Sequence, residues 1–153
     1  MKVVKTSIEN TRELYRKSFI SHSAIKVHLI EHLKKECWSS IDISQYSTFT
    51  IPDVVFQNKQ IVILTEIKPS RASINEIERG IGQVIIYLLH NNCHAMLVCA
   101  YEWSDMLRDI YSMLHQKRLH VLCYDQEGKW HRISEGLELE ELEQNEHINE
   151  RSS

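Results

Sequence analysis

The chain has 153 residues, of which 42% are hydrophobic, 25% charged and 8% aromatic, as is typical of one globular domain with a full-sized core. A formal net charge of −3 does not favour a general nucleic-acid coat protein. No apolar run approaches the length of a membrane span, and the N-terminal residues lack the apolar stretch of a secretory signal. We therefore expect an intracellular protein, cytoplasmic or nuclear, that does not bind a membrane.

The acidic residues are concentrated at the C-terminal end of the sequence. Residues 134–153 contain seven glutamates and one arginine, which leaves the rest of the chain with a net charge of about +3. We predict a single folded domain over residues 1–133, followed by a solvated, loosely ordered acidic tail over residues 134–153. The four cysteines form no C-x-x-C pair, so we expect reduced and mostly buried thiols.

Apolar spacing and β-branched residues predict alternating helices and strands. The predicted elements are helices over residues 8–19 and 23–37, strands over 41–50, 52–56 and 60–68, a helix over 74–90, a strand over 94–101, a helix with Ser104 as its N-cap and Leu107, Ile110, Tyr111 and Leu114 inward, and a strand over 119–125. This order predicts an α/β sandwich around a mixed sheet, with a meander first and crossover units after it.

Three charged residues interrupt the apolar strands on either side of Asn58-Lys59: Asp53, Glu66 and Lys68. Strand alternation places Glu66 and Lys68 on one face, at the end away from the turn. A turn centred on Asn58-Lys59 pairs Asp53 with Leu64, so Asp53 shares that face. Glu66 is then its diagonal neighbour, with Cα atoms roughly 7–8 Å apart.

Two carboxylates at this spacing can bind one divalent cation. Mg²⁺ and Mn²⁺ favour oxygen ligands, and the peptide carbonyl of Ile67 is a further candidate ligand. Such an ion polarises a phosphoryl oxygen and lowers the pKa of a bound water. Lys68 could orient that water or stabilise charge in the transition state. The alternative is a strand end that reaches solvent and carries a surface Glu–Lys ion pair.

Pro52-Asp53, followed by twelve residues and then Glu66-Ile67-Lys68, resembles the signature of the PD-(D/E)xK nuclease superfamily. The resemblance implies a restriction-endonuclease-like core of helix, three-strand meander, helix and strand, here with an added C-terminal helix and strand. It also implies a nuclease that hydrolyses phosphodiester bonds, in which Asp53 and Glu66 hold Mg²⁺ or Mn²⁺ and Lys68 positions or activates the water. The resemblance also implies DNA more than RNA as the substrate, because that is the common substrate of the superfamily. It further implies a homodimer or a larger nucleic-acid-processing assembly.

The next predicted helix carries Gln83 and Tyr87, which resemble the Q-x-x-x-Y motif of the RecB-type branch, where the motif helps to shape the active site. The two positions share a helical face, and Arg79 lies one turn earlier, where it could meet a phosphate. The alternative is a solvated polar face. The superfamily often has a further acidic residue on the helix before the meander, and we favour Glu31 as this metal ligand. The other candidates are Glu13, Glu36 and His28.

Two rival interpretations remain. Residues 28–32, H-L-I-E-H, match the H-x-x-E-H pattern of inverted zinc metallopeptidases, in which two histidines bind zinc and the glutamate is the base. The match is short, the chain contains nine histidines, and nothing singles out Glu76 or Glu102 as a third ligand. The second rival is a catalytically silent nuclease-fold module that binds nucleic acid or a protein partner. The intact set of Asp53, Glu66 and Lys68 argues against it.

Overall fold

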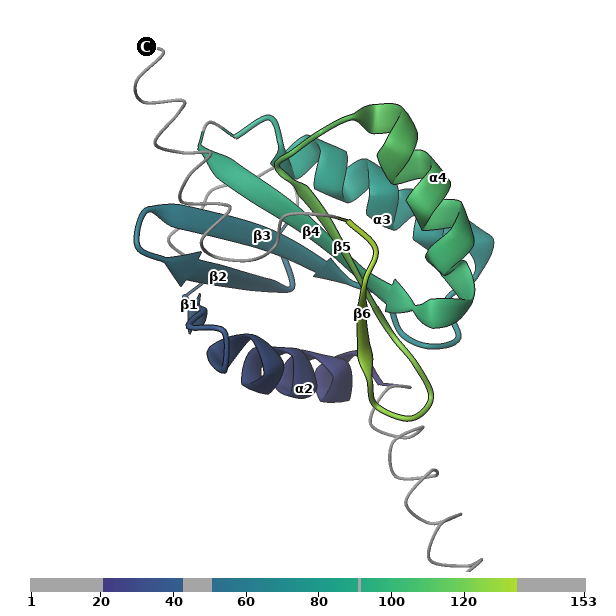
Figure 1. Cartoon of the computed structure of the whole chain (residues 1–153), viewed down its shortest axis with the longest axis horizontal. Coiled ribbons are helices and arrows are strands. Elements are labelled where there is room, and N and C mark those ends of the chain that lie inside the picture. The colour runs from purple at the N-terminus through teal and green to yellow at the C-terminus, as the bar shows by residue number, and fades with distance from the viewer. Residues whose placement is uncertain (1–20, 43–50, 91, 135–153) are drawn as a thin grey trace, which may run out of the picture.

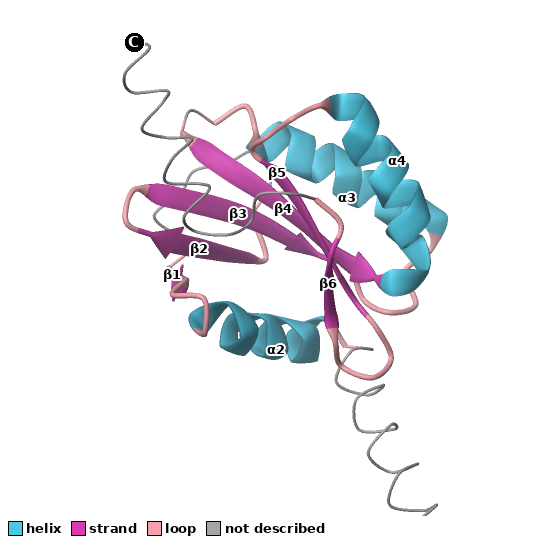
Figure 2. Cartoon of the chain, viewed as in Figure 1, coloured by secondary structure: helices cyan, strands magenta, loops and turns pink. Residues whose placement is uncertain are grey.

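A computed structural model of the chain describes residues 21–42, 51–90 and 92–134. Its helices are α2 (His22–Lys34), α3 (Ile74–Tyr87), α4 (Ser104–Leu114) and the short 3-10 helix η2 (Tyr101–Trp103). Its strands are β1 (Ser39–Ile41), β2 (Val54–Asn58), β3 (Ile61–Ile67), β4 (Cys93–Ala100), β5 (Leu119–Tyr124) and β6 (Trp130–Arg132), as Figure 2 shows. The predicted helix over residues 8–19, most of the predicted strand over 41–50 and residues 135–153 lie outside the described residues.

The strands form one mixed sheet in the order β1-β2-β3-β4-β5-β6. Strands β1, β2 and β3 make an antiparallel meander, β3, β4 and β5 run parallel, and β6 returns antiparallel to β5. Helix α2 covers one face of the sheet, and α3 and α4 cover the other (Figure 1). The predicted α/β sandwich, with a meander first and crossover units after it, is confirmed at this level.

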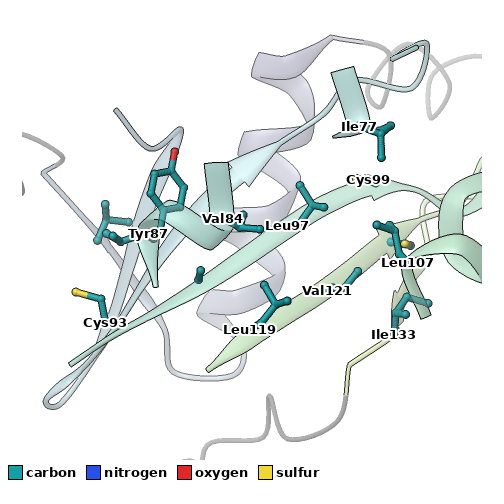
Figure 3. Close-up of a cluster of buried hydrophobic side chains, with 14 of the residues drawn as sticks. Ile77, Val84, Tyr87, Cys93, Leu97, Cys99, Leu107, Leu119, Val121 and Ile133 are labelled. Carbon is teal, nitrogen blue, oxygen red and sulfur yellow. The ribbon is translucent and has the colours of Figure 1, made fainter. Parts of the chain in front are cut away.

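Hydrophobic cores fill both faces of the sheet. The predicted stripe of α2, Ile25, Leu29 and Leu33, is fully buried against one face. On the other face, α3 buries Ile77, Val84 and Tyr87 (Figure 3). Because helices cover both faces, every residue of β3 is buried. Glu66 is only 6% exposed, so the alternative of a surface ion pair at this strand end is wrong.

The β2–β3 hairpin differs from its predicted register by two residues. Val55 pairs with Leu64, and the turn lies at Lys59-Gln60 with Lys59 at φ 54°. Asn58 remains in the strand, and its Nδ2 donates to the carbonyl of Cys37 at 2.7 Å. A shift of two residues keeps every side chain on its face.

Helix α4 also departs from prediction at both ends. Ser104 is the first helical residue and is buried, while Trp103 occupies the N-cap position without a capping side-chain bond. Leu107 is buried as expected, but Leu114 is 42% exposed, because the helix ends there with His115 in a left-handed conformation. The inward prediction for Leu114 is therefore wrong.

The C-terminal part of the described chain adds an element that the sequence pattern did not predict. Strand β6 pairs with β5 after a tight loop, and the Oγ of buried Ser134 accepts a hydrogen bond from Val121 N at 2.8 Å. The domain therefore extends through Ser134. Three of the four free cysteines are buried, and Cys37 is exposed. In the described part of the chain, no helix combines the length and the apolar character needed to cross a membrane.

Candidate functional site

Asp53, Glu66 and Lys68 meet at the carboxyl end of β3. Asp53 directly precedes β2, and its backbone N donates to the carbonyl of Thr65 at 2.9 Å. Thr65 is the partner of Val54, so this bond is one residue out of register and the regular pairing of the hairpin ends at Val54 and Thr65. Asp53 nevertheless lies close to Glu66, because its charge acts on the Glu66 carboxyl.

Two donors hold the carboxylate of Asp53. The backbone N of Ile67 donates to its Oδ2 at 2.7 Å, and Nε2 of His22 lies 2.9 Å from the same oxygen. His22 is the first residue of α2, so this contact joins the helix on one face of the sheet to the hairpin. The Asp53 side chain is 20% exposed, and the carboxylate therefore remains open to solvent while its orientation is fixed.

The carboxyl group of Glu66 is more deeply buried. Its Oε2 accepts a hydrogen bond from the Tyr87 hydroxyl at 2.8 Å, and its Oε1 lies 3.6 Å from Nζ of Lys68. Tyr87 is the last residue of α3, and it reaches Glu66 because long helical side chains lean toward the helix N-terminus. Tyr87 is fully buried, so the orientation of this hydrogen bond is set by the core.

The environment of Glu66 disfavours its ionised form. Burial first, and then the nearby charge of Asp53, raise the pKa of this carboxyl to about 7, although Tyr87 and Lys68 act in the opposite direction. Two carboxylates held close together favour either a shared proton or a bound cation. This is the electrostatic condition that a divalent metal ion relieves.

Lys68 is fixed through its backbone and its side chain. Its N donates to the carbonyl of Val98 at 2.8 Å, and its carbonyl accepts from the Tyr124 hydroxyl at 2.7 Å. Its side chain, 12% exposed, passes over Gly80 of α3. A Cβ at Gly80 would lie only 2.7 Å from the Cε of Lys68 and 3.1 Å from Leu97, so the glycine makes room for the lysine.

Of the three predicted site residues on α3, Tyr87 hydrogen-bonds to Glu66, and among the described residues Gln83 and Arg79 do not. Tyr87 donates its hydroxyl hydrogen bond to Glu66. Gln83, one turn earlier, has its Oε1 buried without a hydrogen-bond partner in the described residues. Arg79 is exposed on α3, and no hydrogen bond or ion pair joins it to either carboxylate within the described chain.

The predicted metal ligand Glu31 lies away from the site. It is exposed on α2, nine residues after His22. Nine helical residues span about 13 Å and turn the side chain to the opposite side of the helix. His22, and not Glu31, is therefore the α2 residue that reaches Asp53. The alternative Glu36 lies 3.6 Å from Arg132, and Glu13 lies outside the described residues.

The zinc interpretation of residues 28–32 gains no support. His32 stacks on Trp130 with ring centroids 5.5 Å apart, and burial lowers its pKa. Across residues 21–42, 51–90 and 92–134, no group of three or more His, Cys, Asp or Glu side chains is placed to hold a metal. Asp53 and Glu66 supply two oxygen ligands, and Mg²⁺ is commonly held by one or two carboxylates together with waters and substrate phosphates. The residues present fit such an ion.

Two contributors were missed from the sequence, His22 and Gly80. Ser21 is a good N-cap residue, and its Oγ accepts from Ala24 N at 3.1 Å, which marks His22 as the start of the helix. That signal gives the boundary of the helix but not its neighbour. Glycines inside a strongly helical pattern, here Gly80 and Gly82, raise the question of a close approach, but only the structure shows that Gly80 has one.

Comparison with known proteins adds little to this picture. No family model and no curated protein matches the chain. Among solved structures, a fdxN element excision controlling factor protein from Anabaena variabilis is similar with a TM-score of 0.43 and 18% sequence identity, over 67% of this chain and 92% of that chain. Similarity of this extent does not establish a common fold or function.

Proposed function

We propose that this chain is a divalent-metal-dependent nuclease that hydrolyses phosphodiester bonds, with DNA favoured over RNA by the resemblance to the PD-(D/E)xK superfamily. The observation that carries the proposal is the pairing of two inward-held carboxylates, Asp53 and Glu66, with an ammonium group 3.6 Å from one of them. Each of these groups is costly to bury, and together they form a cation and phosphate site.

The order of elements supports the same proposal. Helix α2, the meander β1–β2–β3, helix α3 and strand β4 follow the order of the restriction-endonuclease-like core. Asp53 lies directly before the second strand of that meander and Glu66 lies on the third, on the hairpin where the superfamily carries its motif. Helix α4 and strand β5 are then the proposed C-terminal addition, to which β6 is attached.

The residues of the chain have separate roles in the proposed reaction. When bound, the metal would polarise the scissile phosphate and raise the acidity of a water molecule. Asp53 and Glu66 would hold it, with Asp53 oriented by Ile67 N and by His22. Tyr87 fixes the orientation of Glu66, and Lys68 supplies positive charge where the phosphorane gains negative charge.

Gln83 would support the site from the next turn of α3. Its buried Oε1 has no hydrogen-bond partner in the described part of the chain, so it is free to accept a bond from an enclosed water molecule. Arg79 is exposed one turn earlier, where a phosphate further along the substrate could reach it.

The test is cleavage of a labelled panel of single-stranded, duplex, flapped and four-way DNA, together with RNA, in Mg²⁺, Mn²⁺ or EDTA. We expect metal-dependent cleavage that is lost in Asp53→Ala and in Lys68→Ala. Asp109→Ala, which removes an exposed carboxylate of α4, is the matched control and should cleave as the wild type does.

A Mn²⁺ titration separates inactivity from the absence of a site. Binding that Asp53→Ala and Glu66→Gln abolish, without cleavage of any substrate, would indicate a missing partner or an untested substrate. No Mn²⁺ binding by the folded wild type would reject the nuclease and leave the silent nuclease-fold module as the better account.

A further inference from the structure

An exposed aromatic side chain lies at the carboxyl end of β4, the strand next to β3. Tyr101, the first residue after β4, is 44% exposed, and its ring packs on His131 of β6 with centroids 4.4 Å apart. His131 is in turn tied to Asp125, whose Oδ2 lies 2.7 Å from Nε2 of the imidazole. We call Tyr101 and His131 the aromatic ledge.

The ledge is held in place by the loop between β5 and β6. Oδ1 of Asp125 accepts hydrogen bonds from the backbone N of Glu127 at 2.8 Å and of Lys129 at 2.9 Å. The backbone N of Asp125 also donates to the carbonyl of Lys129 at 3.0 Å. The loop therefore fixes Asp125, Asp125 fixes His131, and His131 supports the ring of Tyr101. An exposed ring supported in this way loses little conformational entropy when a ligand stacks on it.

The ledge lies on the same face of the sheet as Glu66 and Lys68. His131 pairs with Cys123, whose side chain belongs to the core under α3 and α4, as Leu64 of β3 also does. Strand alternation then assigns His131, Glu66 and Lys68 to that face.

The ledge and the site lie at the same end of the parallel strands. Ile67 is level with Val98 across the β3–β4 pair, so Tyr101 lies two residues beyond the level of Lys68 on the neighbouring strand. Strand spacing and rise place the two Cα atoms roughly 8 Å apart. The Tyr101 ring packs on His131 of β6, on the side of β4 away from β3, so a base one or two nucleotides from a phosphate at Lys68 is within reach of the ring.

We infer that the aromatic ledge binds an unpaired nucleobase one or two nucleotides from the scissile phosphate, so that the substrate is single-stranded nucleic acid or a splayed strand end. This rests on the proposed function, because the phosphate must lie at Lys68. An aromatic ring accepts any base by stacking, but a base inside a duplex is already stacked on its neighbours and must be extruded first. The aromatic ledge would therefore distinguish unpaired from base-paired nucleic acid, and would not distinguish one base from another.

The test is the binding of a fluorescein-labelled oligothymidylate, measured by anisotropy in EDTA, alongside its cleavage in Mn²⁺. We expect Tyr101→Ala to raise the Kd roughly tenfold, as for the loss of one base–aromatic stack, and Tyr101→Trp to restore it. An abasic strand with the same phosphates should bind Tyr101→Ala and the wild type equally. Met113→Ala, which trims an exposed apolar side chain of α4, is the control for general surface effects.

The outcomes separate the inference from the function it rests on. If the wild type binds and cleaves the strand and Tyr101→Ala does both equally well, the ledge is not a base site and the nuclease stands. If Tyr101→Ala weakens binding but the wild type cleaves nothing, the base-binding site is supported and the proposed nuclease activity is rejected. If the folded wild type neither binds nor cleaves the strand, both are overturned. Melting curves of Tyr101→Ala and Tyr101→Trp check that each variant folds.

Discussion

Glu66 links the stability of the metal-free protein to pH. Its pKa is raised to about 7 by burial and by Asp53, so its contribution to stability is complete below the unfolded value and is lost as the pH rises through about 7. We expect the wild type in EDTA to lose stability relative to Glu66→Gln between about pH 5 and pH 8. Urea unfolding across this range measures the difference. Parallel pH profiles for the two proteins would contradict the assignment.

Gly80 and Gly82 provide a matched pair of substitutions on α3. Gly80→Ala should lower kcat, because its methyl group displaces the Lys68 side chain, whose Cε would lie 2.7 Å away. A methyl group at Gly82 would have no atom within 4 Å, so Gly82→Ala should cleave normally and gain about 0.5–1 kcal/mol of stability. Single-turnover cleavage and thermal melts of both variants measure this. Equal activity in the two variants would show that Lys68 tolerates displacement.

How far the site was predictable depends on the residue. Asp53, Glu66, Lys68 and Tyr87 were predicted to lie together because their spacing, strand alternation and motif resemblance all agree, and the structure brings them together. The contact of His22 with Asp53 could not be predicted from the sequence. It depends on how the start of α2 packs against the hairpin, and hydrophobic periodicity carries no information on that packing.

At the scale of elements, Arg118 ties the end of α3 to the start of β4. Its guanidinium donates to the carbonyl of Leu88 at 2.9 Å and to that of Cys93 at 2.8 Å, with a weaker bond to His90 at 3.4 Å. These are carbonyls at a helix end and a strand start that need donors. The side chain of a residue just before β5 therefore closes the connection between two earlier elements.

We expect Arg118→Met to destabilise the fold by about 1.5–3 kcal/mol, the cost of removing charge-assisted hydrogen bonds from partly buried carbonyls. Arg108→Met, at an exposed position of α4, is the control and should change stability by about 0.5 kcal/mol or less. Chemical denaturation of both variants measures the effect. A loss for Arg118→Met no larger than the control would mean that water satisfies these carbonyls equally well.

The elements themselves were predicted with uneven success for physical reasons. Long periodic segments such as α3 and mostly apolar ones such as β4 were predicted as the right kind of element, with ends displaced by up to three residues, because burial on a helix stripe or on both strand faces leaves a clear pattern. Strand β6 was missed because its three residues are half-buried and carry little apolar pattern. The hairpin register failed because Asn58, a common turn residue, is held in the strand by the carbonyl of Cys37.

For the whole molecule, acid stability depends on a buried histidine pair between β4 and β5. His94 Nδ1 and His120 Nε2 are 3.0 Å apart, and the rings stack with centroids separated by 5.2 Å. Burial, His94 and Arg132 lower the pKa of His120 to about 3. The pair favours the folded state above the unfolded histidine pKa, and this contribution is lost as the pH falls toward about 3.

His120→Leu should therefore flatten the acid side of the stability profile. We expect the stability of the wild type relative to the variant to decrease as the pH falls below about 6.5, whatever the starting stability of the variant. The Glu66 contribution falls with pH between about 4.5 and about 7, so the two contributions offset one another over most of that range, and the metal-free wild type should show a broad plateau of stability there. Urea unfolding at a series of pH values measures both profiles. An unchanged acid slope in His120→Leu would show that other groups control acid unfolding.

Strand β6, three half-buried residues at the edge of the sheet, gives the molecule a preferred place to open. Its amide hydrogens should exchange with deuterated solvent before those of the central strands β3 and β4, since edge strands with little buried area open at lower free energy. Such local opening would carry His131 away from Tyr101 and leave Asp53 and Glu66 in position. Mild denaturant should then abolish the preference for unpaired strands at a lower concentration than it abolishes metal binding.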